Sequence, residues 1–184
     1  RRFAELDRYT RAGKWLHGDD TPLFGLDVFG KKLGIIGLGQ LGETVAKRAG
    51  CFDMDVVYSS RTRKPEVENR LSIAHASLDE LLATSDFIVL LVPLNQQTAR
   101  MLGKREFGLM KKTAVFINAS RGGTIDEKAL IEVLEKRKIH GAGLDVFDQE
   151  PVSPDNPLLQ LDNTVLVPHI GSATAETRDR MAMV

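Results

Sequence analysis

Hydrophobic residues along the chain follow two alternating patterns. Short runs that are apolar throughout predict strands buried on both faces, whereas longer stretches with apolar residues three or four positions apart predict helices with one buried face. Strands that alternate with helices in this way indicate a parallel sheet covered on both faces. The predicted strands comprise residues 33–37, 56–59, 72–75, 87–92, 114–119, 143–147 and 165–167. The predicted helices comprise residues 40–49, 78–84, 104–110 and 126–138.

The two ends of the chain depart from this alternation. Residues 2–15 predict a helix and residues 17–22 a loop, so we expect residues 1–30 to lead into the sheet. The last residues predict a helix that we expect to be truncated. In the middle of the chain, Ser77 is followed three residues later by Glu80, which predicts a capping box at the start of a helix.

Composition and charge exclude several classes of protein. The chain has 25 Lys and Arg against 25 Asp and Glu, so there is no electrostatic reason to expect nucleic acid or a membrane surface as partner. Its longest strongly apolar run, residues 87–94, is too short to cross a bilayer. Cys51 is the only cysteine and cannot form an internal disulfide, which predicts a reducing, cytoplasmic location. His17, His75 and His140 have no metal-ligand spacing, so we expect no metal.

A glycine-rich loop follows the first predicted strand and opens a helix. Residues 37–42 read Gly-Leu-Gly-Gln-Leu-Gly, the G-x-G-x-x-G spacing that in this context is typical of dinucleotide-binding sites. The first glycine allows a tight turn, the second lets the backbone approach a pyrophosphate, and the third lets the helix pack on the sheet. The helix dipole and its exposed N–H groups favour the anion. The sequence therefore predicts an α/β Rossmann-type doubly wound sheet that binds a dinucleotide through Gly37, Gly39, Gln40, Leu41 and Gly42.

The end of the second predicted strand indicates which dinucleotide binds. NAD sites usually have Asp or Glu there, which accepts hydrogen bonds from the ribose hydroxyls. Here Ser60 occupies that position, and Arg61 and Thr62 follow it. These side chains could bind the extra phosphate of NADP by charge-assisted hydrogen bonds. We therefore expect NADP(H) to be preferred and NAD(H) to be the alternative cofactor. A basic loop that contacts only solvent is the other interpretation.

Three further segments follow predicted strands and contain reactive side chains. The carboxyl ends of parallel strands meet at the edge where open α/β sheets bind ligands. We therefore expect Arg121, Glu150 and His169 to lie near the glycine loop. The segments are Ile-Asn-Ala-Ser-Arg-Gly-Gly at 117–123, Gly-Leu-Asp-Val-Phe-Asp-Gln-Glu-Pro at 143–151 and Val-Pro-His-Ile-Gly-Ser-Ala-Thr at 167–174.

With the glycine loop, these segments resemble the D-isomer-specific 2-hydroxyacid dehydrogenase family. The resemblance runs from about residue 24 to the C-terminus, and its Arg-Gly, Asp-x-x-x-x-Glu-Pro and Pro-His-Ile-Gly segments are highly specific in this order. Within the family the chain is most similar to the glyoxylate/hydroxypyruvate reductases, which include the 2-ketogluconate reductases. The Ser-Arg-Thr-Arg loop and the Pro-His-Ile-Gly-Ser-Ala-Thr stretch are the basis of that closer similarity.

The resemblance implies a role for each candidate residue. Arg121 would pair with the substrate carboxylate and polarise the keto group, which suits a planar guanidinium. His169 would protonate the carbonyl oxygen as hydride arrives from the cofactor, and Glu150 would hydrogen-bond the other ring nitrogen. Taken alone, the three could instead be a surface arginine, a solvated loop acid and a buried core histidine. The remaining cofactor contacts implied are Asp145 at the nicotinamide carboxamide and Pro93, Ala119 and Gly171 along the nicotinamide ribose.

The resemblance also predicts an activity and leaves alternatives open. We expect NADPH-dependent reduction of small 2-keto acids, namely glyoxylate, hydroxypyruvate or 2-ketogluconate, to D-2-hydroxy acids. The same three side chains serve NAD(H)-dependent enzymes that act on D-lactate or D-3-phosphoglycerate. A cofactor-sensing, corepressor-like binding protein is the alternative from a different class.

Domain organisation is the point where the chain departs from the family. We expect residues 1–184 to form the NAD(P)-binding domain alone, because family members have a second, substrate-side domain that this chain lacks. The chain is therefore expected to bind cofactor with little or no turnover by itself. Family members are usually homodimers through this domain, and Phe3, Leu6 and Trp15 are the candidate interface residues. Packing of these side chains within one chain is the alternative.

Overall fold

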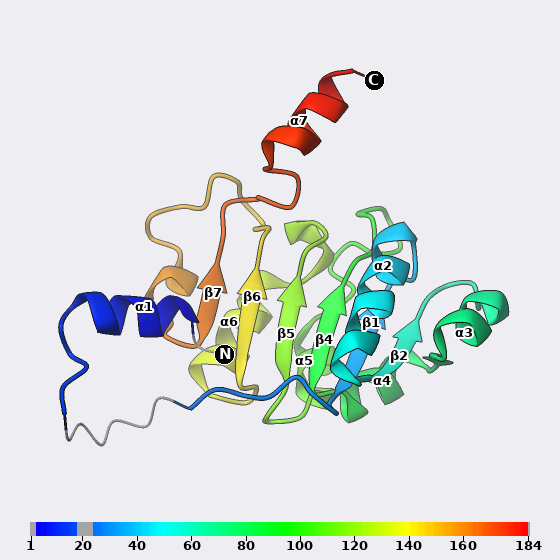
Figure 1. Ribbon diagram of the computed structural model, residues 1–184, viewed down its shortest axis with the longest axis horizontal. Helices are drawn as coiled ribbons and strands as arrows, with labels where there is room; N and C mark the ends of the chain where they lie inside the picture. Colours follow the sequence, from blue (N-terminus) through cyan, green and yellow to red (C-terminus); the bar gives the residue numbers. More distant parts are fainter. Residues whose placement is uncertain (1–2, 18–23, 184) are drawn as a thin grey trace.

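A parallel sheet forms the centre of the computed structural model, which describes residues 3–17 and 24–183. Within these residues the sheet has seven strands in the order β3-β2-β1-β4-β5-β6-β7 (Figure 1). The chain starts at β1, moves outward to β3, and then returns to β4 on the other side of β1, which is the doubly wound order. The predicted fold class is confirmed. The strands are β1 (Lys32–Ile36), β2 (Asp55–Ser59), β3 (Ala74–His75), β4 (Phe87–Leu90), β5 (Val115–Asn118), β6 (Gly141–Leu144) and β7 (Thr164–Leu166).

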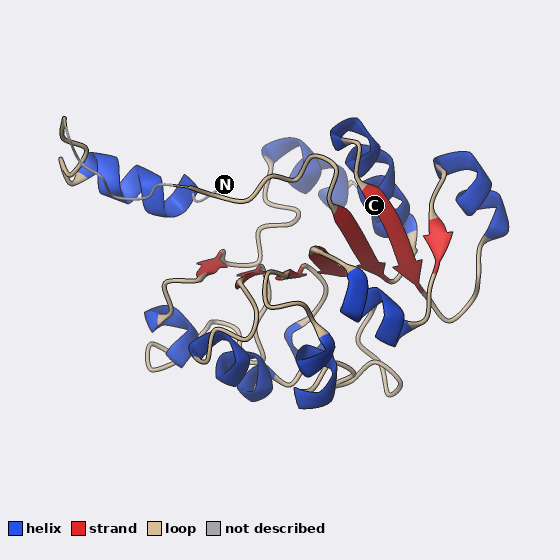
Figure 2. Ribbon diagram, turned by 90° about the horizontal axis from the view of Figure 1, so that it is seen from below, coloured by secondary structure: helices blue, strands red, loops and turns tan. Residues whose placement is uncertain are grey.

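Helices cover both faces of the sheet. Figure 2 shows α2 and α3 on one side and α4, α5 and α6 on the other. The terminal helices α1 and α7 project from the body and bury no side chain. The helices are α1 (Phe3–Arg11), α2 (Gln40–Ala49), α3 (Pro65–Leu71), α4 (Leu78–Thr84), α5 (Lys104–Leu109), α6 (Glu127–Glu135) and α7 (Ala175–Ala182), with the 3-10 helices η1 (Gly50–Phe52), η2 (Gly122–Thr124) and η3 (Pro157–Gln160).

The sheet separates two hydrophobic cores. Because side chains alternate along a strand, Leu33 and Ile35 of β1 pack under α2 and α3, while Ile36 packs on the other face with α4 to α6. At Gly34 the α4 helix comes very close to β1, and an added Cβ would lie 2.5 Å from Leu81 Cδ2. These contacts fix the end of β1, from which the glycine-rich loop starts.

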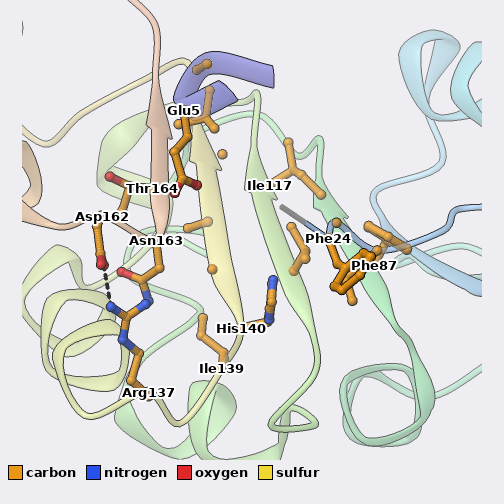
Figure 3. A pocket seen from close by; sticks show the side chains of 18 of the residues that line it. Glu5, Phe24, Phe87, Ile117, Arg137, Ile139, His140, Asp162, Asn163 and Thr164 are labelled. Atoms are coloured by element: carbon orange, nitrogen blue, oxygen red, sulfur yellow. Dashed lines mark hydrogen bonds and ion pairs between the residues drawn. The ribbon is translucent and has the colours of Figure 1, made fainter. Parts of the chain in front are cut away.

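One part of the sheet is not covered by the helices of the described residues. Over β4 to β7, on the α2 side, a hollow of about 490 Å³ lies between the strands, segment 24–26 and α1 (Figure 3). Phe87, Ile117 and Val165 are apolar residues that line it, and Val165 is 52% exposed. The hollow therefore lies on a face of the sheet, away from the loops that follow the carboxyl ends of the strands.

Several element boundaries differ from the sequence expectation. The predicted 143–147 strand is shifted, since β6 covers Gly141–Leu144, and α1 ends at Arg11 although the helical pattern continued to residue 15. Helix α3 was not predicted, because its short, charged sequence shows no clear apolar face. The Ser77 hydroxyl accepts a hydrogen bond from the Glu80 N–H, which confirms Ser77 as the N-cap of α4. Residues 18–22 of the predicted 17–22 loop lie outside the described residues.

Within residues 3–17 and 24–183, none of the helices combines the length and the apolar character that a membrane span requires.

Candidate active site

The loops after β1, β4, β5, β6 and β7 meet at the edge of the sheet that lies uppermost in Figure 1. The last three strands end at Asn118, Leu144 and Leu166, and each is followed by one of the segments that contain Arg121, Glu150 or His169. β5, β6 and β7 are adjacent and in parallel register, so these segments leave the sheet side by side. The strand order therefore brings the segments that contain Arg121, Glu150 and His169 to one edge of the sheet, as the sequence predicts.

The glycine-rich loop has a geometry that suits an anion. Gly37 has a φ of 98°, a conformation that favours glycine, and the loop then turns into α2 with Gly39 as N-cap. An added Cβ on Gly42 would lie 2.4 Å from the Gly37 carbonyl oxygen, so this helix start can approach the turn only because Gly42 has no side chain. At Gly39 a Cβ would meet nothing within 4 Å, so this position faces open space.

That open space belongs to a cavity of about 560 Å³ that joins the glycine loop to Arg121. One wall is the start of α2, another the loop after β4, and the third the loop after β5. The cavity therefore connects the anion-binding end of a helix with a guanidinium. Its lining residues are Gly39, Gln40, Leu41, Leu91, Val92, Pro93, Leu94, Ala119, Ser120 and Arg121.

Buried polar side chains hold the turn that presents Arg121. Asn118 Oδ1 accepts hydrogen bonds from the N–H and the hydroxyl of Ser120, at 3.0 and 2.8 Å. The Thr124 hydroxyl and Asn118 Nδ2 donate to the carbonyl oxygen of Arg121, at 2.6 and 3.3 Å. Asn118 and Thr124 are fully buried, so these bonds are shielded from water. The Arg121 side chain itself is exposed, and its Nη1 donates to the Ser120 carbonyl oxygen at 2.6 Å.

Glu150 and His169 form a hydrogen-bonded pair. His169 Nδ1 lies 2.7 Å from Glu150 Oε2, and Glu150 Oε1 accepts from the Phe147 N–H at 3.1 Å. The hydrogen bond with the His169 ring, together with the bond from Phe147 and the positive charge of Arg121, outweighs partial burial and lowers the pKa of the Glu150 carboxyl below its usual 4.5. The pair is about 40% exposed, with 44% for His169 and 36% for Glu150, so it faces the open edge.

Asp145 ties the end of β6 to the turn after β7. Its two carboxylate oxygens accept hydrogen bonds from the N–H groups of Ile170 and Gly171, at 2.6 and 3.0 Å. His169, next to that turn, has a φ of 52°, a left-handed conformation that is uncommon for residues other than glycine. Asp145 therefore stabilises the backbone that orients the His169 ring.

The loop after β2 extends this edge of the sheet. The Ser60 hydroxyl donates to the Thr62 carbonyl oxygen at 2.7 Å, and Arg61 Nη1 lies 3.4 Å from Gln97 Oε1 in the loop after β4. Because β2 and β4 are the two neighbours of β1, the contact between Arg61 and Gln97 links the loops on either side of the glycine loop. Ser60, Arg61 and Thr62 do not line the cavity itself.

The sequence of this chain is similar to those of known proteins. The family model described as D-isomer specific 2-hydroxyacid dehydrogenase, NAD binding domain, matches residues 1–171. The chain belongs to this dehydrogenase family. It is 48% identical to glyoxylate/hydroxypyruvate reductase B of Enterobacter sp. (strain 638) and 49% identical to a probable 2-ketogluconate reductase of Dictyostelium discoideum, over 183 residues in each case. These alignments cover 99% of this chain but 56% and 55% of the relatives.

A solved relative has the same fold. The crystal structure of a glyoxylate reductase from Paecilomyes thermophila matches with a TM-score of 0.89 and 41% identity, covering 100% of this chain and 54% of that one. The chain therefore spans about half the length of the dehydrogenase relatives it matches.

Apart from Gly37 and Gly42 within the glycine loop and Ser60, Arg61 and Thr62 in the loop after β2, the structure places the sequence-predicted residues in two groups. One group lines the cavity, with Gly39, Gln40, Leu41, Pro93, Ala119 and Arg121. The other lies in the adjoining loops, with Asp145 hydrogen-bonded to Gly171 and Glu150 to His169. Sequence reasoning missed Asn118, Ser120 and Thr124, whose signal is a run of polar residues directly after a buried strand.

Proposed function

We propose that the protein containing this chain reduces small 2-keto acids to D-2-hydroxy acids with NADPH. The observation that supports this best is the cavity that joins the glycine loop to Arg121, beside the hydrogen-bonded pair of Glu150 and His169. The substrates we propose are glyoxylate, hydroxypyruvate and 2-ketogluconate. Relatives named as a glyoxylate/hydroxypyruvate reductase and a probable 2-ketogluconate reductase support that substrate class.

The residues present fit a nicotinamide dinucleotide. A pyrophosphate suits the open space at Gly39, where α2 begins with unpaired N–H groups, and no side chain of the loop occupies that space. Pro93 and Ala119 lie further along the same cavity, toward Arg121, where the nicotinamide end would bind. When bound, the cofactor supplies the hydride.

The chain's own side chains would orient the keto acid and supply a proton. Arg121 would bind the substrate carboxylate and withdraw electron density from the keto oxygen. His169 uses Nδ1 for Glu150, which leaves Nε2 to donate a proton to that oxygen. Glu150 fixes the ring, and its lowered pKa keeps it a negatively charged acceptor near neutral pH.

NADP(H) is the cofactor we propose as preferred. The end of β2 presents Ser60, Arg61 and Thr62, and none of these would repel a 2′-phosphate as a carboxylate would. NAD(H) is the alternative, and it would bind through the same glycine loop.

The proposed activity also requires a second, substrate-side domain. Because the chain spans about half the length of its relatives, we propose that residues 1–184 are the cofactor-binding domain and show little turnover by themselves.

We also propose a homodimer through α1 and the hollow of Figure 3, where exposed Phe3 and Val165 would be covered. Trp15, 73% exposed, lies beyond α1, and Leu6 is half-buried. The cytoplasmic location stays a prediction.

The test is a steady-state screen of the full-length protein that contains this chain. NADPH and NADH would each be combined with glyoxylate, hydroxypyruvate, 2-ketogluconate, pyruvate and 3-phosphohydroxypyruvate. Fastest turnover with NADPH and one of the first three is the expected result. A preference for pyruvate or 3-phosphohydroxypyruvate with NADH would replace the proposal by the D-lactate or D-3-phosphoglycerate activity. Cofactor binding without turnover of any keto acid would favour a corepressor-like binding protein.

A further inference from the structure

Four cationic side chains lie in or near the loop that follows β2, and three of them are paired with carboxylates. Arg63 makes a two-pronged contact with Glu68, from Nε to Oε1 at 2.9 Å and from Nη2 to Oε2 at 2.8 Å. Lys64 and Arg70 both bind Glu43, at 3.2 and 2.6 Å. The proximity of Lys64 and Arg70 lowers the pKa of Glu43, so it stays charged as their partner.

Arg61 is the exception in this group. Within the described residues it has no carboxylate partner, and its hydrogen bond to the neutral Gln97 amide is long, at 3.4 Å. Such a contact costs little to break compared with a charge-assisted, two-pronged one. Arg61 is therefore the side chain of this loop that is available to an incoming anion.

The Tyr58 side chain links the loop after β2 to helix α3. It is fully buried near the end of β2, and its hydroxyl donates to Glu68 Oε1 at 2.7 Å and accepts from the Lys64 N–H at 2.7 Å. Glu68, on α3, thus receives both Tyr58 and Arg63, which leaves the loop fixed at residues 63 and 64. These two contacts lower the pKa of Glu68 to about 2, so its charge persists at neutral pH.

We propose that Tyr58 and Glu68 are positioning residues for recognition of the cofactor's 2′-phosphate: they anchor the loop and engage Arg63, so that Arg61 is the guanidinium presented to that phosphate. This inference rests on the proposed preference for NADPH. It separates two neighbouring arginines by role, because Arg63 acts on the loop whereas Arg61 acts on the ligand. It also gives a role to the hydroxyl of a fully buried tyrosine near the end of β2, where we expect the ribose to bind.

The experiment measures dissociation constants of NADPH and NADH for the 184-residue chain by fluorescence titration. Tyr58→Phe removes one hydroxyl and no charge. It is expected to weaken NADPH by about fivefold to tenfold, the size expected for one lost hydrogen bond, and to change NADH by less than about twofold. Tyr9→Phe, at the other tyrosine of the chain, is the matched control and should change neither constant.

A second variant keeps the test decisive if Tyr58→Phe fails to fold. Arg63→Gln combined with Glu68→Gln removes the two-pronged contact and leaves the net charge unchanged. It should weaken NADPH by a similar factor and leave NADH unaffected, whereas a general loss of stability would weaken both cofactors together.

The outcomes separate this inference from the proposed preference. If Arg61→Ala abolishes the preference for NADPH but the Tyr58 and Arg63/Glu68 variants keep the wild-type ratio of the two constants, the positioning role is wrong and the preference stands. If the wild-type chain binds NADPH and NADH equally and Arg61→Ala changes neither, both are overturned.

Discussion

A Cβ atom added to Gly122 would lie 1.8 Å from the carbonyl oxygen of Phe147. The loop after β5 and the loop after β6 are thus in backbone contact, with no room for a side chain between them. Gly122 follows Arg121, and the Phe147 N–H binds Glu150, so this contact sets the spacing between the guanidinium and the carboxylate.

Gly122→Ala should therefore reduce both stability and activity. The methyl group forces the two loops apart, and overpacking of this kind typically costs about 1–3 kcal/mol. Thermal unfolding of the chain measures the stability, and steady-state assays of the full-length protein measure kcat. The control is Gly108→Ala on α5, where an added Cβ meets nothing within 4 Å. If Gly122→Ala and Gly108→Ala unfolded at the same temperature, the close backbone contact between Gly122 and Phe147 would be contradicted.

The glycine loop offers a pair of substitutions with opposite expected effects. Gly39→Ala should fold normally, since its Cβ meets nothing within 4 Å, but should weaken cofactor binding by about tenfold or more because the methyl group occupies the space of the pyrophosphate. Gly42→Ala should instead destabilise the fold, since its Cβ would lie 2.4 Å from the Gly37 carbonyl oxygen. Unfolding curves and cofactor titrations of both variants check this, and wild-type cofactor affinity in a folded Gly39→Ala variant would count against a ligand at that position.

Apolar patterning was sufficient for most of the fold, and the exceptions have physical causes. The β6 strand reads Gly-Ala-Gly-Leu, so it lacks the β-branched and aromatic residues that identify strands, and its predicted position was shifted toward Val146 and Phe147. The α3 helix has seven residues and buries one side chain, Val67, so no periodicity was visible. Such short elements form because their neighbours hold them in place.

The acid–base pair should control the chemical step. His169→Gln in the full-length protein should lower kcat by about 10² to 10⁴, the usual contribution of a positioned proton donor. Glu150→Gln should lower it less, because an amide can still contact Nδ1 but carries no charge. Cofactor affinity should change little in either variant. Measured kcat values together with NADPH titrations check this, and wild-type turnover by His169→Gln would show that the proton comes from elsewhere.

Stability should depend on pH through Glu68. Its pKa is lowered from 4.5 to about 2 by the hydrogen bonds from Arg63 and Tyr58, so the folded state binds a proton there less readily than the unfolded chain. The contribution is therefore fully present above the unfolded pKa and is lost as pH falls from 4.5 toward 2. Unfolding temperatures of wild type and Glu68→Gln should differ at neutral pH and converge over that acidic range.

Glu176→Gln on exposed α7 controls for the loss of a surface charge. A difference between wild type and Glu68→Gln that stays constant down to the acidic limit would show that the Glu68 contacts do not stabilise the fold.

Sequence motifs identified the candidate site residues but not the side chains that hold their loops in place. The segments with Arg121, Glu150 and His169 were recognisable from their order and spacing. The supporting bonds of Asn118 and Thr124 are local, within residues 118–124, but a run of polar residues does not reveal which of them bond to one another. Tyr58 bonds to Lys64 and Glu68 beyond the end of its strand, and a lone polar residue in a strand does not reveal such partners. Asp145 shows the limit well, since its motif did not reveal the hydrogen bonds that it accepts from Ile170 and Gly171, while its contact with the cofactor stays a prediction.

The links between these loops also determine how the site can move. The backbone contact at Gly122, the Glu150–His169 hydrogen bond and the two hydrogen bonds that Asp145 accepts from Ile170 and Gly171 join the loops after β5, β6 and β7, so these loops should move as a single unit. Thermal fluctuations should shift that unit as a whole, and heating should first fray the projecting helices α1 and α7. Under the proposed function, substrate would enter and product would leave through motion of other parts of the protein, while these three loops keep their alignment from one turnover to the next.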